Sequence, residues 1–225
     1  MVLDSNGYPH ISYIDVTKHD LKYAYWDGSS WNIEIVDSSG VAGECTSLAL
    51  DSNGYPHISY ADSINNKLKY AYWNGASWQI QTLDSAKVAY TSLALDSRDY
   101  PHIGYFDYNP WDLKYAYWNG VSWQIETVDS EGQVGLGVSL KLDSSDFPRM
   151  SYCENGGFLR YAYYTHLGWR FEILDSRASL DTSLGLDSNE YPHISFLMSP
   201  KDLRYAHWDG TTGIEINTSG EGKSN

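Results

Sequence analysis

Acidic residues recur in this sequence at a nearly constant interval. The first series consists of Asp15, Asp62, Asp107 and Glu154. The second series consists of Asp37, Asp84, Asp129 and Asp175. Clustered carboxylates are the ligands that Ca²⁺ prefers, and paired carboxylates catalyse glycoside hydrolysis. Aspartates in loops also accept hydrogen bonds from the amides that follow them, which would make them turn residues only. Calcium at the second series is the one cofactor that the sequence suggests.

Tryptophans flank a short turn, Trp-Asp/Asn-Gly, that recurs through the chain. The first Trp of each turn is Trp26, Trp73, Trp118 or Trp208. In three copies a second Trp follows, as in Trp26–Trp31. Cross-strand aromatic pairing explains such pairs, but an exposed indole face also stacks on the C–H face of a sugar ring. The first Trp of each turn is therefore a candidate ligand-binding residue.

Histidine recurs at His10, His57, His102 and His193, with Arg149 in the fourth position of the series. Each begins a separate predicted strand away from the axis, so the rings would lie too far apart to share one metal ion. We expect each to hydrogen-bond to the neighbouring repeat. No Cys/His cluster suggests zinc, and Cys45 and Cys153 lie in non-neighbouring repeats, so we expect no disulfide between them.

One phrase underlies these spacings. Leu-Asp-Ser-Asn-Gly-Tyr-Pro-His-Ile-Ser-Tyr occurs at Leu3–Tyr13 and again, unchanged, at Leu50–Tyr60. Looser copies follow at Leu95–Tyr105, Leu142–Tyr152 and Leu186–Phe196. Five copies at a period of about 45 residues are typical of propellers, solenoids and arrays.

The second copy indicates what one repeat forms. Alternating side chains predict short strands at 47–50, 57–60, 68–73 and 78–83, with turn residues between them. Four short antiparallel strands make one propeller blade. We therefore predict an all-β, five-bladed β-propeller with four antiparallel strands per blade and about 45 residues per repeat.

The predicted domain is a single propeller over residues 1–218, with repeats starting near 1, 46, 91, 138 and 182. Residues 219–225 are predicted to be a disordered tail. Because each copy brings its own four strands, five blades could close without a shared blade. Alternation along the strands predicts that Tyr60 and Tyr70 share one face of a blade, with His57 on the other.

The two ends of the predicted strands differ in how much the copies vary. The turns at one end are nearly uniform, whereas the loops at the other end, such as 16–19 and 108–111, differ between copies. A face formed by variable loops is often the binding face. We therefore place the ligand site there, with the first acidic series and with Tyr108, Trp111 and Phe158 as exposed anchors.

The net charge of −14 argues against nucleic acid and anionic membranes as partners. No stretch reaches the roughly 18 apolar residues of a membrane span. Met1 and Val2 run directly into the repeat, with no signal peptide visible. We expect a monomer outside the cell or at its surface, with any signal peptide absent from this chain; a cytoplasmic location stays open.

The hairpin Trp-Asp/Asn-Gly-x-Ser-Trp, found at Trp26–Trp31, Trp73–Trp78 and Trp118–Trp123, resembles the Asp-box turn of sialidase-like propellers. It departs from that turn because Gly follows the Asp or Asn directly. The whole period resembles the five-bladed tachylectin-type lectins and is similar in texture to the six-bladed fucose-lectin propellers. The resemblance implies a sugar-binding propeller. It does not imply sialidase activity, because the arginines are scattered along the sequence.

Repetition of this kind favours several similar weak sites over one asymmetric catalytic centre. We therefore predict a non-catalytic, multivalent carbohydrate-binding module. A protein-interaction scaffold that uses the variable loops is the second hypothesis. The third is a glycoside hydrolase that uses carboxylates of the first acidic series, among which Glu154 stands in the most divergent copy.

Overall fold

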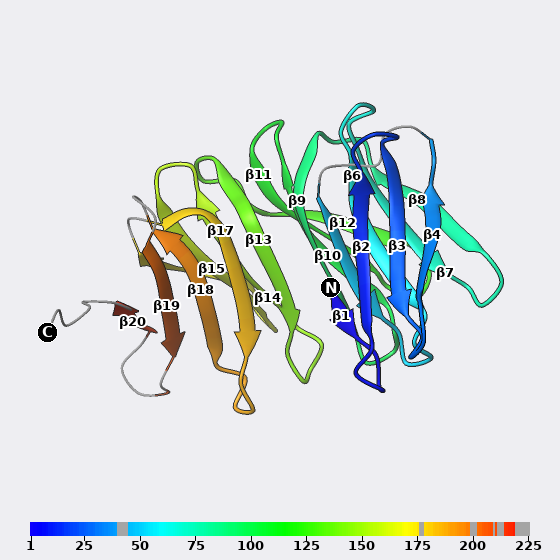
Figure 1. Ribbon diagram of the computed structural model, residues 1–225. Helices are drawn as coiled ribbons and strands as arrows, with labels where there is room; N and C mark the ends of the chain where they lie inside the picture. The colour runs from blue at the N-terminus through cyan, green and yellow to red at the C-terminus, as the bar shows by residue number, and fades with distance from the viewer. Residues whose placement is uncertain (40–44, 176–177, 199–201, 209, 211–213, 219–225) are drawn as a thin grey trace, which may run out of the picture.

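The computed structural model describes the chain except for residues 40–44, 176–177, 199–201, 209, 211–213 and 219–225. The predicted tail at 219–225 lies outside the described residues. The described chain forms five antiparallel sheets of four strands each, and the strands of each sheet are consecutive in the sequence (Figure 1). Each predicted repeat therefore corresponds to one sheet.

The first sheet comprises β1 (Val2–Leu3), β2 (Pro9–Asp15), β3 (Asp20–Trp26) and β4 (Trp31–Asp37). The second comprises β5 (Thr46–Leu50), β6 (Pro56–Asp62), β7 (Lys67–Trp73) and β8 (Trp78–Asp84). The third comprises β9 (Val88–Leu95), β10 (Pro101–Asp107), β11 (Asp112–Trp118) and β12 (Trp123–Asp129). The fourth comprises β13 (Val134–Leu142), β14 (Pro148–Glu154), β15 (Phe158–Thr165) and β16 (Gly168–Asp175). The fifth comprises β17 (Ala178–Leu186), β18 (Pro192–Met198), β19 (Asp202–Trp208) and β20 (Ile214–Thr218).

An aspartate shapes the turn between the first two strands of each sheet. In the second sheet, Asp51 Oδ1 accepts the backbone N–H groups of Asn53 at 2.9 Å and Tyr55 at 2.7 Å. Gly54 takes a φ of +80°, a conformation that residues with a side chain rarely adopt. The uniform phrase Asp-Ser-Asn-Gly is thus the chemistry of one tight turn.

The later sheets have an acidic residue in place of this glycine. Asp99, Asp146 and Glu190 all stand at positive φ. Asp99 accepts hydrogen bonds from the backbone N–H of Ser52 at 3.0 Å and from its hydroxyl at 2.6 Å. Asp146 accepts the same two bonds from Ser97. The costly backbone conformation places a carboxylate where it joins the turns of neighbouring sheets.

The register between β6 and β7 corrects the predicted faces of a blade. The hairpin between these strands closes over residues 63–66, so that Tyr70 lies opposite Ser59. Side chains of residues directly opposite each other point to the same side of a sheet. Tyr70 therefore lies on the face of Ser59 and His57, and the prediction that it shares a face with Tyr60 is wrong.

Consecutive sheets pack face to face, and the apolar core lies between them. In the second sheet Ile58, Tyr60 and Leu68 are completely buried. Toward the inner strands, the hydroxyls of Ser59 and Thr91 lie 2.6 Å apart and link the second sheet to the third. Equivalent hydroxyl pairs join the first sheet to the second and the fourth to the fifth.

A cluster of polar side chains, which we call the inter-sheet clasp, joins the last strand of one sheet to the middle strands of the next. Asp37 Oδ2 accepts hydrogen bonds from the Tyr60 hydroxyl at 2.7 Å and from Lys69 Nζ at 2.9 Å. Lys69 Nζ also lies 3.3 Å from Asp62 Oδ2. Burial alone would raise the pKa of Asp37, but hydrogen bonds from Tyr60, Ser39 and Lys69 bring it down to about 2.

The clasp recurs at the next two interfaces. Between the second and third sheets it comprises Asp84, Tyr105, Lys114 and Asp107. Between the third and fourth sheets it comprises Asp129, Tyr152, Arg160 and Glu154. In the fifth sheet Phe196 and Met198 stand where the Tyr and the second acid would be. The clasp therefore joins the first four sheets.

The ring of sheets is not closed among the described residues. Each sheet packs extensively against the next along the chain, but the first and fifth share no comparable packed face. In Figure 1 these two sheets flank an opening in the ring. The step between neighbouring sheets is set by the side chains packed between them, and five such steps do not complete a turn. The all-β propeller architecture is confirmed, but a propeller of five blades is wrong.

We predict that Lys69→Met lowers the free energy of unfolding by about 3 kcal/mol, because it leaves two buried acids without their cation. The matched variant Lys22→Met removes a cation that pairs with Asp15 at 2.6 Å in a more exposed site, with no second acid within ion-pair distance among the described residues. It should cost less than about 1 kcal/mol. Urea denaturation measures both. Equal losses would show that the clasp contributes no more than a surface ion pair.

Candidate functional site: pockets between neighbouring sheets

Among the described residues, four equivalent pockets lie between consecutive sheets, and we call them the inter-sheet pockets. From the first interface to the fourth, their volumes are about 230, 250, 190 and 290 Å³. The preceding sheet contributes a His or Arg, two tyrosines and a Glu or Gln. The following sheet contributes an aromatic residue and a proline from its first turn, with a Trp or Tyr at the end of its third strand. Each pocket therefore combines aromatic walls with a few convergent polar groups, as ligand sites do.

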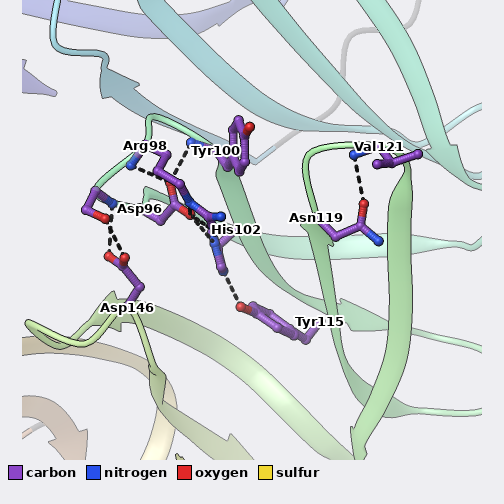
Figure 2. Close-up of polar contacts among 9 residues, drawn as sticks. Asp96, Arg98, Tyr100, His102, Tyr115, Asn119, Val121 and Asp146 are labelled. Carbon is purple, nitrogen blue, oxygen red and sulfur yellow. Dashed lines mark hydrogen bonds and ion pairs between the residues drawn. The ribbon is translucent and has the colours of Figure 1, made fainter.

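His102 shows how the polar groups of a pocket are arranged (Figure 2). Its Nδ1 is hydrogen-bonded to the Tyr115 hydroxyl. Burial raises the pKa of Tyr115, so the phenol keeps its proton and donates a hydrogen bond to Nδ1. The ring hydrogen then lies on Nε2, which is 3.7 Å from Asp96 Oδ2 and has no hydrogen-bond partner in the described part of the chain. Burial also lowers the pKa of His102, which keeps the ring neutral.

At the first three pockets an indole N–H donates a hydrogen bond to the acidic or amide side chain. Trp78 Nε1 donates to Glu34 at 2.8 Å, and Trp123 Nε1 donates to Gln81 at 2.8 Å. Trp169 continues the series on Glu126 at 3.0 Å. The same indoles pack edge-on against the tyrosines of the preceding sheet. These contacts fill hydrogen-bonding capacity that a ligand would otherwise use.

The pocket between the fourth and fifth sheets differs in two residues. Arg149 replaces the histidine, and its Nη2 donates to Asp143 at 2.8 Å. Ile214 lies opposite Trp208, at the position where the other sheets have the second Trp. Glu172, the acid of this pocket, therefore meets no indole N–H there. The exchange leaves the largest of the four inter-sheet pockets without the internal partner that the other three have.

Two buried polar atoms of this pocket have no hydrogen-bond partner among the described residues. They are Arg149 Nε and the Tyr161 hydroxyl. Burial raises the pKa of Tyr161 to about 12, so the phenol stays protonated and remains a donor. Leaving a buried polar group without a partner costs roughly 1–3 kcal/mol. The Arg149 guanidinium lowers the pKa of this phenol against the effect of burial, so the two side chains also interact with each other on the pocket wall.

The structure places three of the predicted tryptophans in these pockets. Trp73, Trp118 and Trp208 line the first, second and fourth pockets from the following sheet. Trp26 holds the same position in the first sheet, which has no preceding sheet in the described chain. All four belong to the uniform-turn end of the blades, and the pockets open there rather than among the variable loops.

The first acidic series lies at the opposite end of the strands and is ion-paired. The nearest cation atoms are those of Lys22 on Asp15 (2.6 Å), Lys69 on Asp62 (3.3 Å), Lys114 on Asp107 (2.7 Å) and Arg160 on Glu154 (2.6 Å). Backbone amides of the following loops also donate to Asp15 and Asp107. None of these acids lines an inter-sheet pocket among the described residues.

The second acidic series forms the clasps. Asp37, Asp84 and Asp129 each accept a tyrosine hydroxyl and face a Lys or Arg of the next sheet. Asp175 ends β16 at the equivalent position. In the described part of the chain, no group of three or more His, Cys, Asp or Glu side chains could hold a metal ion. Calcium binding stays a prediction from the sequence.

The predicted loop anchors are packed rather than fully exposed. Tyr108 and Trp111 contact Phe106 and each other, with ring centroids 4.7–5.7 Å apart, and both pack against the core. Lys87 Nζ lies 5.2 Å from the centre of the Tyr108 ring. Phe158 is partly buried at the start of β15. These rings complete the core at the loop end, which weakens the hypothesis of a loop-based protein interface.

The histidines also differ from the prediction. His10, His57, His102 and His193 each bond a tyrosine of the same sheet, not of the neighbouring one. The register that pairs β6 with β7 brings His57 and Tyr70 onto one face, and the other sheets repeat it.

The sequence reasoning missed the acid or amide of each pocket. These residues are Glu34, Gln81, Glu126 and Glu172. They recur on the fourth strand at the repeat interval, so the spacing that revealed the other series could have revealed them. The turn aromatics Tyr55, Tyr100, Phe147 and Tyr191 recur in the same way.

Comparisons with known proteins support the architecture. No protein-family model matches the chain, and no curated protein matches it in sequence. An Aleuria aurantia lectin described as a six-bladed β-propeller with a novel fucose recognition mode has a TM-score of 0.68 and 14% identity, over 97% of this chain and 81% of that one. AofleA from Arthrobotrys oligospora has a TM-score of 0.65 and 17% identity, over 92% and 70%. The lectin SapL1, in complex with α-methyl fucoside, has a TM-score of 0.67 and 14% identity, over 95% and 77%.

These likenesses show the fold and sharpen the correction to the blade count. The five sheets cover 81% of the six-bladed lectin, which is close to five blades in six. The predicted resemblance to propeller lectins is confirmed for the fold, but the comparisons do not support the sialidase-like and tachylectin-type families. Among the described residues, no helix has the length and apolar character needed to cross a membrane.

We predict that acidification below pH 6.5 destabilises the folded chain before its carboxylates titrate. Burial lowers the pKa of His10, His57 and His102, so the unfolded chain binds protons more strongly than the folded chain. The free energy of unfolding should therefore fall between about pH 6.5 and pH 5. Urea denaturation at several pH values measures the slope. His57→Gln should reduce it, and an unchanged slope would contradict the role of His57.

Proposed function

We propose that this protein binds carbohydrate without catalysing a reaction, through the pockets between neighbouring sheets. The observation that carries the proposal is the pocket between the fourth and fifth sheets. It combines a guanidinium, a carboxylate and aromatic walls with two buried polar atoms that have no hydrogen-bond partner in the described part of the chain. Sugars present hydroxyl groups around an apolar C–H face, so they match that combination.

In this pocket Trp208 and Tyr191 supply aromatic surface from the fifth sheet. The Arg149 and Tyr161 side chains line the pocket and are the donors that sugar oxygens would meet there. Glu172 can accept a hydrogen bond from a sugar hydroxyl. A pyranose that stacks on the aromatic wall would place its hydroxyls toward these three groups. The other three pockets have the same plan, but an indole already engages their acid or amide.

The solved lectins that share the fold give the first ligand to test. The Aleuria aurantia lectin recognises fucose, and SapL1 was solved in complex with α-methyl fucoside. Fucose binding by this chain is therefore part of the proposal, as is a location outside the cell or at its surface. A hydrolase is less well supported, because the carboxylates expected to catalyse are held in ion pairs away from the pockets.

We predict that Trp208→Ala lowers the affinity for the bound glycan at least about tenfold, equivalent to about 1.4 kcal/mol, because it removes the stacking wall. Glu172→Gln should weaken binding less severely, because the amide still offers an oxygen acceptor. Trp26→Ala is the matched control and should leave binding unchanged, since no described sheet precedes it. A glycan array identifies the ligand, with α-methyl fucoside as the first probe, and calorimetry measures the variants.

Binding that survives Trp208→Ala but is lost with Trp111→Ala would place the ligand at the variable loops instead. A folded chain that binds no glycan on the array would exclude the proposal.

A further inference from the structure

The two sheets at the opening of the ring each present a face that is buried everywhere else in the molecule. In the fifth sheet, Tyr205 is 37% exposed, whereas its counterparts Tyr115 and Tyr161 are each 3% exposed. Leu197 is 38% exposed, whereas its counterpart Phe106 is completely buried. These residues lie on the face that, in the first four sheets, packs against the next sheet along the chain.

The first sheet shows the complementary half of the same interface. Leu3 is 61% exposed and Trp31 is 48% exposed. Tyr13 is partly exposed, whereas its counterparts Tyr60 and Tyr105 are completely buried against the preceding sheet. The hydroxyls of those two tyrosines donate to an aspartate of that preceding sheet. The first sheet therefore has the tyrosine and lysine of a clasp but no described acid from a preceding sheet.

The fifth-sheet face also carries polar groups of the kind that bond a neighbouring sheet elsewhere in the molecule. His207 Nδ1 is buried and has no hydrogen-bond partner among the described residues. Ser195 lies at the position from which Ser59 and Ser151 each bond a threonine hydroxyl of the next sheet. The face thus has the apolar and polar groups that the internal interfaces use.

We propose that these two faces form one docking site, and that its occupant is a single four-stranded sheet of this same repeat. The internal interfaces show what such a sheet presents: a threonine opposite Ser195, an indole against Tyr205 and, on its other side, an aspartate for Tyr13 and Lys22. The coverage of about four fifths of a six-bladed lectin agrees with an opening one sheet wide. A whole second copy fits less well, because its remaining four sheets would continue past the opening and leave the first-sheet face of the original chain uncovered.

The test is to append one more four-stranded sheet to the end of the chain. Residues 36–85 of this chain contain the end of β4, the connector and the whole second sheet, and they replace residues 219–225. In the extended chain, residue 36 follows Thr218 directly. The appended sheet therefore connects to the fifth sheet in the way that the second sheet connects to the first. The appended sheet brings Asp84 toward Tyr13 and Lys22, as it faces Tyr105 and Lys114 in the parent chain.

We expect the extended chain to be monomeric and to unfold at a temperature higher by about 5 °C or more. Leu197→Ser should lower the unfolding temperature of the extended chain by several degrees more than that of the parent chain. The matched variant Phe106→Ser, at an interface present in both chains, should lower both alike. Cysteines at Ser195 and at the appended copy of Thr46 should form a disulfide only if the appended sheet docks in register.

Three results would overturn the proposal. The extended chain could fail to fold or show no thermal gain, Leu197→Ser could affect both chains equally, or the cysteine pair could fail to form. Light scattering on the parent chain tests the second-copy occupant. A parent dimer that Leu197→Ser dissociates would show that another copy, not a single sheet, covers the face.

Discussion

The structure depends on one interaction more than on any other, the inter-sheet clasp in which an aspartate of one sheet meets a tyrosine hydroxyl and a Lys or Arg of the next. Asp37, Tyr60 and Lys69 are its best example, with oxygen and nitrogen contacts of 2.7 and 2.9 Å. Because the tyrosine ring is fully buried, its hydroxyl must find a partner at that depth. The apolar layers supply most of the burial, but they are nearly interchangeable between sheets. At the first three interfaces the clasp ties the last strand of one sheet to the middle strands of the next.

This interaction explains why the pockets and the variable loops lie at opposite ends of the blades. The clasps and the packed rings of Phe106, Tyr108 and Trp111 occupy the loop end. The pockets open at the other end, where uniform turns hold one sheet against the next. The uniform residues at that end therefore form pocket walls as well as turns. Two exchanges, Arg149 for histidine and Ile214 for tryptophan, are enough to make one pocket different from the other three.

Much of the fold follows from the sequence, because the repeated phrase and its period identify the strands and the turns that join them. The faces of a blade could not be read in the same way. They depend on the number of residues in the hairpin at 63–66, and a shift of one residue moves Tyr70 to the other face. The number of blades is set by the angle between sheets, which no local pattern encodes. The pockets draw residues from two sheets, so Glu172 and Trp208 come together only when the fourth and fifth sheets pack.

The tryptophans Trp73, Trp118 and Trp208 could be found from their recurrence alone, although their partners could not. The measurement that tests the central claim most directly is a crystal structure of the protein soaked with α-methyl fucoside. We predict density for a sugar between the fourth and fifth sheets, stacked on Trp208 and within hydrogen-bonding distance of Arg149 and Glu172. Density at the axis or among the variable loops, with the pocket between these sheets empty, would contradict it.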